Sequence, residues 1–277
     1  MGLLVAFAAA AAYVLGKFGG YGWSLVGPAL ILSGGFSFFS YYFSDRIVLA
    51  IAGAKLTTDA RLKEVVAEIA LKAGLPPPRV YEIADPAPNA FATGRDPSHA
   101  ALALTTGLRQ KLNRLEMESV LAHELGHIKN FDTRLAAVAA VLVGFVSMLA
   151  DWFMRSLWFK ENRDNRDNQG EMIFVAIGLI LALLSPIIAT LIQLAISRRR
   201  EFDADAGSAK ITSDPESLAS ALEKISADRT PARFANNATA HLFIVNPFKG
   251  KDAVSFLSGL FNTHPPVEER VKLLREM

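Results

Sequence analysis

The chain has 277 residues, enough for one or two domains with a hydrophobic core, and 51% of them are apolar, with a mean hydropathy of +0.27. A formal net charge of +2 does not indicate a nucleic-acid partner. Because the chain has no cysteine, disulfides and thiolate zinc sites are excluded, and a metal site would have to use histidine and carboxylate ligands.

Four long apolar segments divide the chain, at residues 1–16, 18–44, 135–154 and 172–197. A helix needs about 20 predominantly apolar residues to cross a bilayer, so the last three are candidate transmembrane helices and the first is marginal. A buried core helix is the alternative for each segment. Near the ends of the apolar segments, Lys and Arg are more frequent on the side of residues 45–134 and 198–277 than on the opposite side. This favours a cytoplasmic position for these two polar segments.

The polar segment 45–134 contains a helical pattern within residues 57–74, with Leu62, Val65, Val66, Ile69 and Ala70 on one face, and it ends at Gly74. Three short runs bounded by Pro, Asp and Gly follow, at 79–83, 89–94 and 99–106, and they predict strands of a small sheet. Asn113 with Glu116 predicts a capping box for the next helix.

The polar segment 198–277 contains two further predicted helices. Ser213 with Glu216 indicates the start of the first. Prolines at 265–266 precede the terminal helix, in which Val267, Val271 and Leu274 face inward.

The sequence "HELGH" at 123–127 is the clearest chemical motif. In a helix, His123 and His127 project from one face, and Glu124 lies about 100° further round, where it can reach a metal-bound water. Zinc metalloproteases use this spacing, with two histidine ligands and a glutamate as general base. The alternative is a pair of surface histidines on an amphipathic helix.

The third ligand must come from elsewhere, because no further histidine follows closely. The sequence "RRREFDAD" offers Glu201 and Asp205, which lie four positions apart and share one helical face. We expect Glu201 to be the third ligand and Asp205 to accept the free ring N–H of a ligand histidine. A solvated run of charges is the alternative. A membrane hairpin of 135–154 and 172–197 would bring Glu201 close to His127.

Four motifs, "PNAFATG", "LAHELGHIKNFDT", "SRRREFDADAGSAKI" and "THPPVEERVKLL", occur in this order and resemble the HtpX-like membrane zinc endopeptidases, relatives of the type I CAAX prenyl proteases. The resemblance covers nearly the whole chain, and the short first apolar segment is a departure from it. It implies a mainly α multi-pass protein of the cell membrane with about four transmembrane helices. It also implies a cytoplasmic, gluzincin-like α+β zinc protease domain with a small sheet.

This resemblance implies a role for each residue of the motifs. One Zn²⁺ per chain would be bound by three ligands, namely His123, His127 and Glu201. Glu124 would act as general base and Asp205 would support a ligand histidine. An extended substrate would bind by strand addition at Asn89, Ala90 and Phe91.

The resemblance also places His264 and Arg270 near the metal, where they would bind substrate or stabilise the oxyanion. From the residues alone, His264 could equally be a capping or packing histidine. Arg270 could equally be a structural ion-pair partner of Glu268, Glu269 or another acid.

The activity implied is hydrolysis of misfolded or damaged membrane proteins on the cytoplasmic side, in quality control during stress. The expected partners are polypeptide substrates and the lipid bilayer, with no nucleic acid; no oligomeric state is assigned. A CAAX-type prenyl-protein protease is an alternative that would need more spans. A non-catalytic scaffold held together by zinc is a further alternative, but Glu124 argues against it. A transporter is disfavoured because Asp151 is the only charged residue inside the apolar segments.

The expected organisation has four parts. Residues 1–44 form an N-terminal transmembrane hairpin, and 45–134 form the first part of the protease domain, with the HELGH helix. Residues 135–197 form a second transmembrane hairpin, and 198–277 form the second part of the protease domain, with the third ligand.

Overall fold

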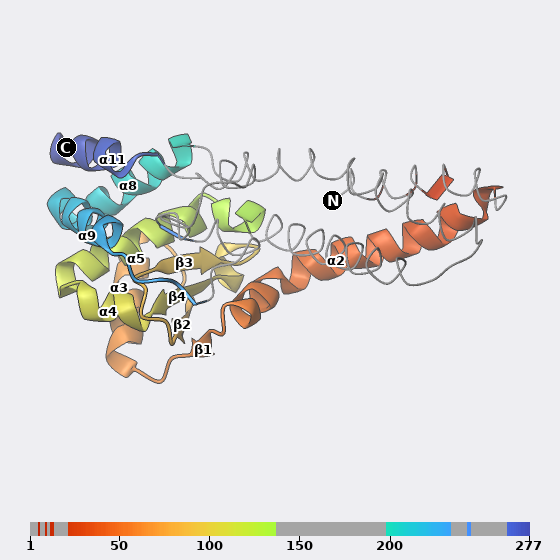
Figure 1. Cartoon of the computed structure of the whole chain (residues 1–277), viewed down its shortest axis with the longest axis horizontal. Coiled ribbons are helices and arrows are strands. Elements are labelled where there is room, and N and C mark those ends of the chain that lie inside the picture. Colours follow the sequence, from red (N-terminus) through yellow and green to blue (C-terminus); the bar gives the residue numbers. More distant parts are fainter. Residues whose placement is uncertain are drawn as a thin grey trace, which may run out of the picture. The chain divides into compact units, whose positions relative to one another are not determined.

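The structure, a computed structural model, describes residues 22–136, 198–233, 243–244 and 265–277, together with positions 5, 9, 12 and 13. Two compact units divide the chain: residues 1–43 with 142–189, and residues 44–141 with 190–277. Every element of the site described below belongs to the second unit (Figure 1).

A 3-10 turn, η1 (Gly22–Leu25), leads into the long helix α2 (Val26–Ile51), which contains most of the predicted apolar segment 18–44. Within the described ranges, no helix is both long enough and apolar enough to be a candidate membrane span. The predicted span at 172–197, and all but the first two residues of 135–154, lie outside the described residues.

A four-stranded mixed sheet forms the centre of the second unit. Its strands are β1 (Lys55–Leu56), β2 (Arg79–Ile83), β3 (Ala90–Thr93) and β4 (Ala101–Thr105), in the order β1-β2-β4-β3. β2 and β4 are parallel, whereas the two outer strands pair antiparallel with their neighbours. The three predicted strands are confirmed, and β1, with only two residues, is too short for a sequence pattern to indicate.

The loop between β2 and β3 takes the chain past the position of β4, so that β3 becomes an edge strand. Asp85 fixes this loop: its carboxylate accepts hydrogen bonds from the backbone N–H groups of Ala87 (2.9 Å) and Arg233 (2.6 Å). Its carbonyl oxygen accepts a third from the N–H of Gly107 (2.9 Å). The buried Asp85 therefore satisfies the polar backbone groups of the crossing.

Two predicted helices of the polar segment 45–134 are confirmed. In α3 (Ala60–Ala73), Asp59 caps the N-terminus and Gly74 ends the helix with φ 74°, the left-handed conformation that glycine adopts readily. α5 (Arg114–Lys129) carries the HELGH motif and begins with the predicted capping box of Asn113 and Glu116. A 3-10 turn, η2 (Pro97–His99), and the short helix α4 (Thr106–Lys111) were not predicted.

The described part of the C-terminal segment contains three helices: α8 (Arg198–Thr212), α9 (Pro215–Ala227) and α11 (Val267–Arg275). The prediction that Ser213 caps α9 is wrong. Ser213 has a left-handed φ of 56°, and the cap is the next residue, Asp214, whose carboxylate accepts from the N–H of Ser217. Asp214 followed by proline at the first helical position is itself a favoured helix start.

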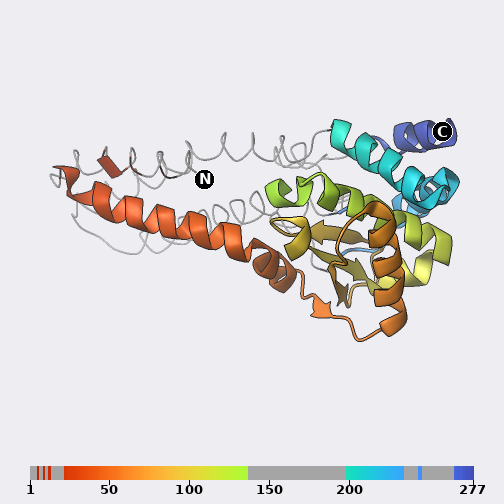
Figure 2. The same ribbon diagram turned by 180° about the vertical axis from the view of Figure 1, so that it is seen from behind.

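Side chains pack against both faces of the sheet. On one face, Leu102 and Leu104 pack in a large core with residues of α3, α4, α5, α9 and α11. On the other, Phe91 packs in a smaller cluster with Val48 and Leu49 from the end of α2. α5 lies between β3 and the helices α3, α8 and α9, and Figures 1 and 2 show α8 running alongside it. The motif helix is therefore held from several sides.

Candidate metal centre

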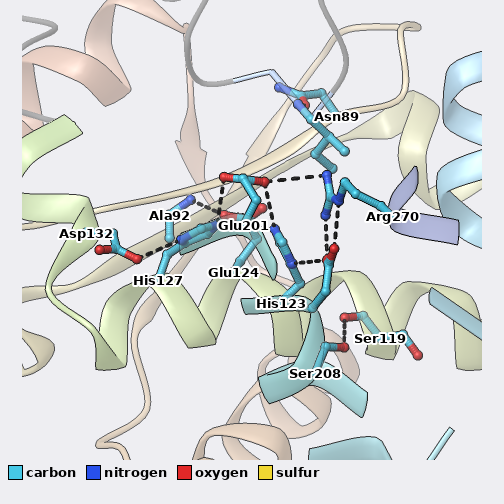
Figure 3. Close-up of polar contacts among 12 residues, drawn as sticks. Asn89, Ala92, Ser119, His123, Glu124, His127, Asp132, Glu201, Ser208 and Arg270 are labelled. Atoms are coloured by element: carbon cyan, nitrogen blue, oxygen red, sulfur yellow. Dashed lines mark hydrogen bonds and ion pairs between the residues drawn. The ribbon is translucent and has the colours of Figure 1, made fainter. Parts of the chain in front are cut away.

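Three potential ligands converge from two helices. His123 and His127 lie one turn apart on α5, and Glu201 lies in the first turn of α8 (Figure 3). One ligand atom from each of these side chains lies within 4.8 Å of the other two. Among the described residues, they form the single group of His, Asp and Glu side chains that could hold a metal ion.

The separations of the ligand atoms fit a tetrahedral zinc site. Nε2 of His123 lies 3.2 Å from Nε2 of His127. The carboxylate oxygens of Glu201 lie 3.8 Å and 3.5 Å from these two nitrogens, respectively. Ligands about 2.0–2.1 Å from zinc, at tetrahedral angles, would be about 3.4 Å apart. The three side chains thus lie close to the positions that zinc requires.

The carboxylates that face Nδ1 of the two imidazole rings explain why this cluster favours a cation. Nδ1 of His123 lies 2.9 Å from Oδ1 of Asp205, and Nδ1 of His127 lies 3.1 Å from Oδ2 of Asp132. A neutral ring that donates through Nδ1 leaves Nε2 as a lone pair. Two such lone pairs and the carboxylate of Glu201 then face one another, which is a donor set suited to a metal ion.

The acidic surroundings also change the protonation of His127. Burial disfavours the charged ring, but the hydrogen bond with Asp132 and the negative charges of Glu201 and Glu124 outweigh burial and raise the pKa of His127 to about 9. Without a metal, the ring is therefore mostly protonated at neutral pH. A metal ion would have to displace this proton on binding.

Gly126 allows the two ligand helices to approach closely. A Cβ atom built on Gly126 would lie 3.3 Å from Cα and 3.5 Å from Cβ of Ala204 on α8. Ala204 is itself fully buried and lies three residues after Glu201. The pair of small residues thus sets the spacing between the helix that carries the histidines and the helix that carries the carboxylate.

Glu124 lies beside the metal ligands and is held by the edge of the sheet. Antiparallel pairing of Asn89 with Thr105 directs the backbone groups of Ala90 and Ala92 outward from β3, because the two orientations alternate along the strand. The N–H of Ala92 donates to Oε2 of Glu124 at 2.9 Å. Glu124 is only 6% exposed, so its carboxylate is shielded from bulk solvent.

Asp205 and Arg270 form a buried ion pair behind His123. Nε and Nη2 of Arg270 donate to the two oxygens of Asp205, at 2.8 Å and 2.6 Å. Burial opposes ionisation of Asp205, but the hydrogen bonds from Arg270 and His123 outweigh burial and hold the pKa of this carboxyl below its ordinary value. Arg270 is 1% exposed, and its Nη1 also lies 3.5 Å from Oε2 of Glu201.

The other predicted site residues have different surroundings. The amide oxygen of the buried Asn89 accepts from the N–H of Ile244 at 3.0 Å, which ties the segment 243–244 to the start of β3. Ala90 is buried at the sheet edge, and Phe91 packs into the smaller core cluster. His264 lies outside the described residues.

Asp132 and Arg200 were not among the predicted site residues. Oδ1 of Asp132 accepts from Nη1 of Arg200 at 2.9 Å, while its Oδ2 faces His127. The available signal was an acid five residues after the second histidine of HELGH. A straight helix would place that acid on a different face from His127. The turn after α5 is therefore needed to bring Asp132 next to the His127 ring.

Comparisons with known proteins agree with this arrangement. Residues 56–277 match the model of peptidase family M48. A protease HtpX homolog of Dictyoglomus thermophilum is 43% identical over 99% of this chain and 87% of its own length, and one of Pyrococcus furiosus is 45% identical over 100% and 94%. The chain is also similar in fold to Ste24p of S. mikatae, with a TM-score of 0.50 and 18% identity. That match covers 88% of this chain and 57% of the Ste24p chain.

The matched region contains both ligand helices, the sheet and the terminal helix, and the HtpX relatives extend over nearly the whole sequence. The chain therefore belongs to peptidase family M48 and is a zinc metalloprotease.

Proposed function

We propose that this protein is a membrane-bound endopeptidase with one zinc ion per chain, which hydrolyses misfolded or damaged membrane proteins at the cytoplasmic face. The observation that carries the proposal is the convergence of His123, His127 and Glu201 beside the carboxylate of Glu124. Two histidines, one glutamate and a neighbouring general base are what metal-assisted peptide hydrolysis requires.

Glu124 supplies the proton transfers of the proposed reaction. When bound, zinc would act as a Lewis acid that lowers the pKa of water and polarises the scissile carbonyl. The Glu124 carboxylate takes the proton from the attacking water and delivers it to the leaving amine. The N–H of Ala92 holds Oε2 of Glu124, which leaves the other oxygen, Oε1, for the water.

The edge of β3 supports binding of an extended substrate by strand addition. The outward backbone groups of Ala90 lie on the same strand edge as the N–H of Ala92 that contacts Glu124. In this proposal Asn89 shapes the edge through its hydrogen bond to Ile244, and Phe91 anchors the strand in the core. The polypeptide backbone would then run directly past the general base.

Arg270 and His264 divide the remaining proposed roles. The bidentate ion pair with Asp205 and the near-complete burial of Arg270 favour a role in holding Asp205 over direct contact with substrate. His264 precedes Pro265, where the terminal segment enters α11, and is the proposed donor to the oxyanion.

The membrane location rests on the sequence. Segments 18–44, 135–154 and 172–197 are long and apolar, and the excess of basic residues on the side of the protease segments favours a cytoplasmic catalytic domain. A protease anchored in this way would meet the exposed segments of damaged membrane proteins.

Cleavage of a purified membrane-protein substrate tests the proposal. The wild type should cleave it, a chelator should stop cleavage, and added zinc should restore it. Glu124→Gln should keep zinc and lose turnover by at least about 100-fold, the usual contribution of a general base. Glu118→Gln, which changes another glutamate on α5, is the matched control and should remain active. Full activity of Glu124→Gln would refute the assignment of the general base.

A further inference from the structure

The chain turns sharply directly after the helix that carries both histidine ligands. α5 ends at Lys129, and Phe131 then adopts a left-handed φ of 61°. A bulky L-residue is strained in this conformation, and Phe131 remains about half exposed, so packing of its ring does not explain the turn. Backbone strain at one position next to a candidate metal site indicates a functional role for the turn.

The turn returns Asp132 to the side of His127. Asp132 is 5% exposed, and its two oxygens have different partners: Oδ2 lies 3.1 Å from Nδ1 of His127, and Oδ1 accepts from Nη1 of Arg200 at 2.9 Å. Arg200 lies in the first turn of α8 and directly precedes Glu201. One carboxylate therefore bridges a ligand on α5 and the residue adjacent to a ligand on α8.

The arrangement repeats the one found at the other histidine. His123 faces Asp205, which is bound by Arg270, just as His127 faces Asp132, which is bound by Arg200. In both cases a carboxylate faces Nδ1, which favours Nε2 as the ligand atom, and the carboxylate is itself oriented by a guanidinium group.

We infer that Asp132 and Arg200 are positioning residues of the metal centre. Asp132 holds His127 with its proton on Nδ1, and Arg200 fixes both Asp132 and the start of α8, so that His127 and Glu201 keep their separation without the metal. This inference rests on the proposed zinc site, but it concerns metal binding and does not depend on which substrate is cleaved.

Zinc affinity and the visible spectrum of bound cobalt test the inference on full-length purified protein. Loss of a carboxylate behind a ligand histidine weakens metal binding by about 10–100-fold. We expect Asp132→Ala to show this loss and a shifted cobalt spectrum, because the His127 ring is free to rotate. Asp132→Asn can still accept from Nδ1 through its amide oxygen, so it should lose less affinity and keep a spectrum closer to wild type.

Substitutions of Arg200 and Arg199 distinguish the hydrogen bond between Arg200 and Asp132 from a general effect of positive charge. Arg200→Met should weaken zinc binding several-fold, and Arg200→Lys should restore part of it. Arg199→Met changes the exposed neighbouring arginine and should leave affinity and spectrum unchanged. Thermal unfolding of the metal-free variants identifies any that fold poorly, in which case Asp132→Asn and Arg200→Met decide.

The outcomes distinguish this inference from the proposed function. Wild-type zinc affinity and cobalt spectrum in folded Asp132→Ala, or in both Asp132→Asn and Arg200→Met where the alanine variant does not fold, would overturn the positioning role. If the wild type binds zinc but cleaves no substrate, and these variants bind zinc more weakly, the positioning role is upheld while the proposed function fails.

Discussion

Replacement of Gly126 by alanine should separate metal binding from stability. The added methyl group would meet the backbone of α8 at 3.3 Å from Cα of Ala204, closer than the ordinary contact range of 3.4–4 Å. Relief requires α8 to move by a few tenths of an ångström, because the neighbour is backbone and cannot rotate away. Glu201 lies three residues before Ala204 on the same helix and would move with it.

Two opposing effects determine the stability of the Gly126→Ala variant. Alanine favours a helix over glycine by about 1 kcal/mol, whereas overpacking in a tight interface costs about 1–3 kcal/mol. We expect the metal-free protein to lose no more than about 2 kcal/mol. Metal–ligand distances tolerate only about 0.2 Å, so the same movement of Glu201 should weaken zinc binding on the order of tenfold.

Gly207→Ala is the matched control, because it makes the same change on α8. A Cβ atom at Gly207 has no neighbour within 4 Å, so alanine there should stabilise the helix by up to about 1 kcal/mol and leave zinc affinity unchanged. Competition with a chromophoric chelator measures the affinity, and thermal unfolding measures the stability. A folded Gly126→Ala variant with wild-type zinc affinity would refute the argument that the glycine sets the helix spacing.

Two further predictions concern stability. Burial opposes ionisation of Glu116, but hydrogen bonds from Lys224, Ser220 and the N–H of Asn113 outweigh burial and lower its pKa below the ordinary 4.5. The contribution of Glu116 to the free energy of unfolding is therefore fully present above about pH 4.5 and is lost as the pH falls further. Glu116→Gln should therefore cost about 1–3 kcal/mol at pH 7 and progressively less towards pH 3, measured by denaturant unfolding at each pH. Removal of zinc present at about 1,000 times its dissociation constant should cost about 4 kcal/mol and lower the unfolding midpoint by roughly 10 °C; an unchanged midpoint would show that the native state does not bind zinc preferentially.

Local patterns made much of the fold predictable. The period of apolar residues and the end at Gly74 mark α3, and the Asn113 capping box marks α5, because each depends on residues within one or two turns. The strands were located by the flanking Pro, Asp and Gly; the bounds 79–83 are correct, whereas β3 and β4 are shorter than predicted by one or two residues at each end. The cap of α9 was misplaced by one residue, because Ser213 and Asp214 are both good capping residues and only the backbone conformation distinguishes them.

The positions of the candidate metal ligands and of Asp205 on shared helical faces could be predicted for the same reason, but the contacts of Asp132 and Arg200 could not. The separation of His123 and His127 by four residues, and likewise of Glu201 and Asp205, fixes a shared helical face without knowledge of the fold. Asp132 depends on a strained turn at Phe131, a conformation that no propensity indicates for phenylalanine.

The two ends of the metal centre are held with unequal strength. Behind His123, the Asp205–Arg270 pair is bidentate and both side chains are almost fully buried. Behind His127, Asp132 receives one described hydrogen bond from Arg200, whose side chain is 34% exposed and therefore more open to screening by salt. Added salt should therefore weaken the support of His127 more than that of His123. The weaker end is also the end where α5 and α8 continue in sequence towards the apolar segments 135–154 and 172–197.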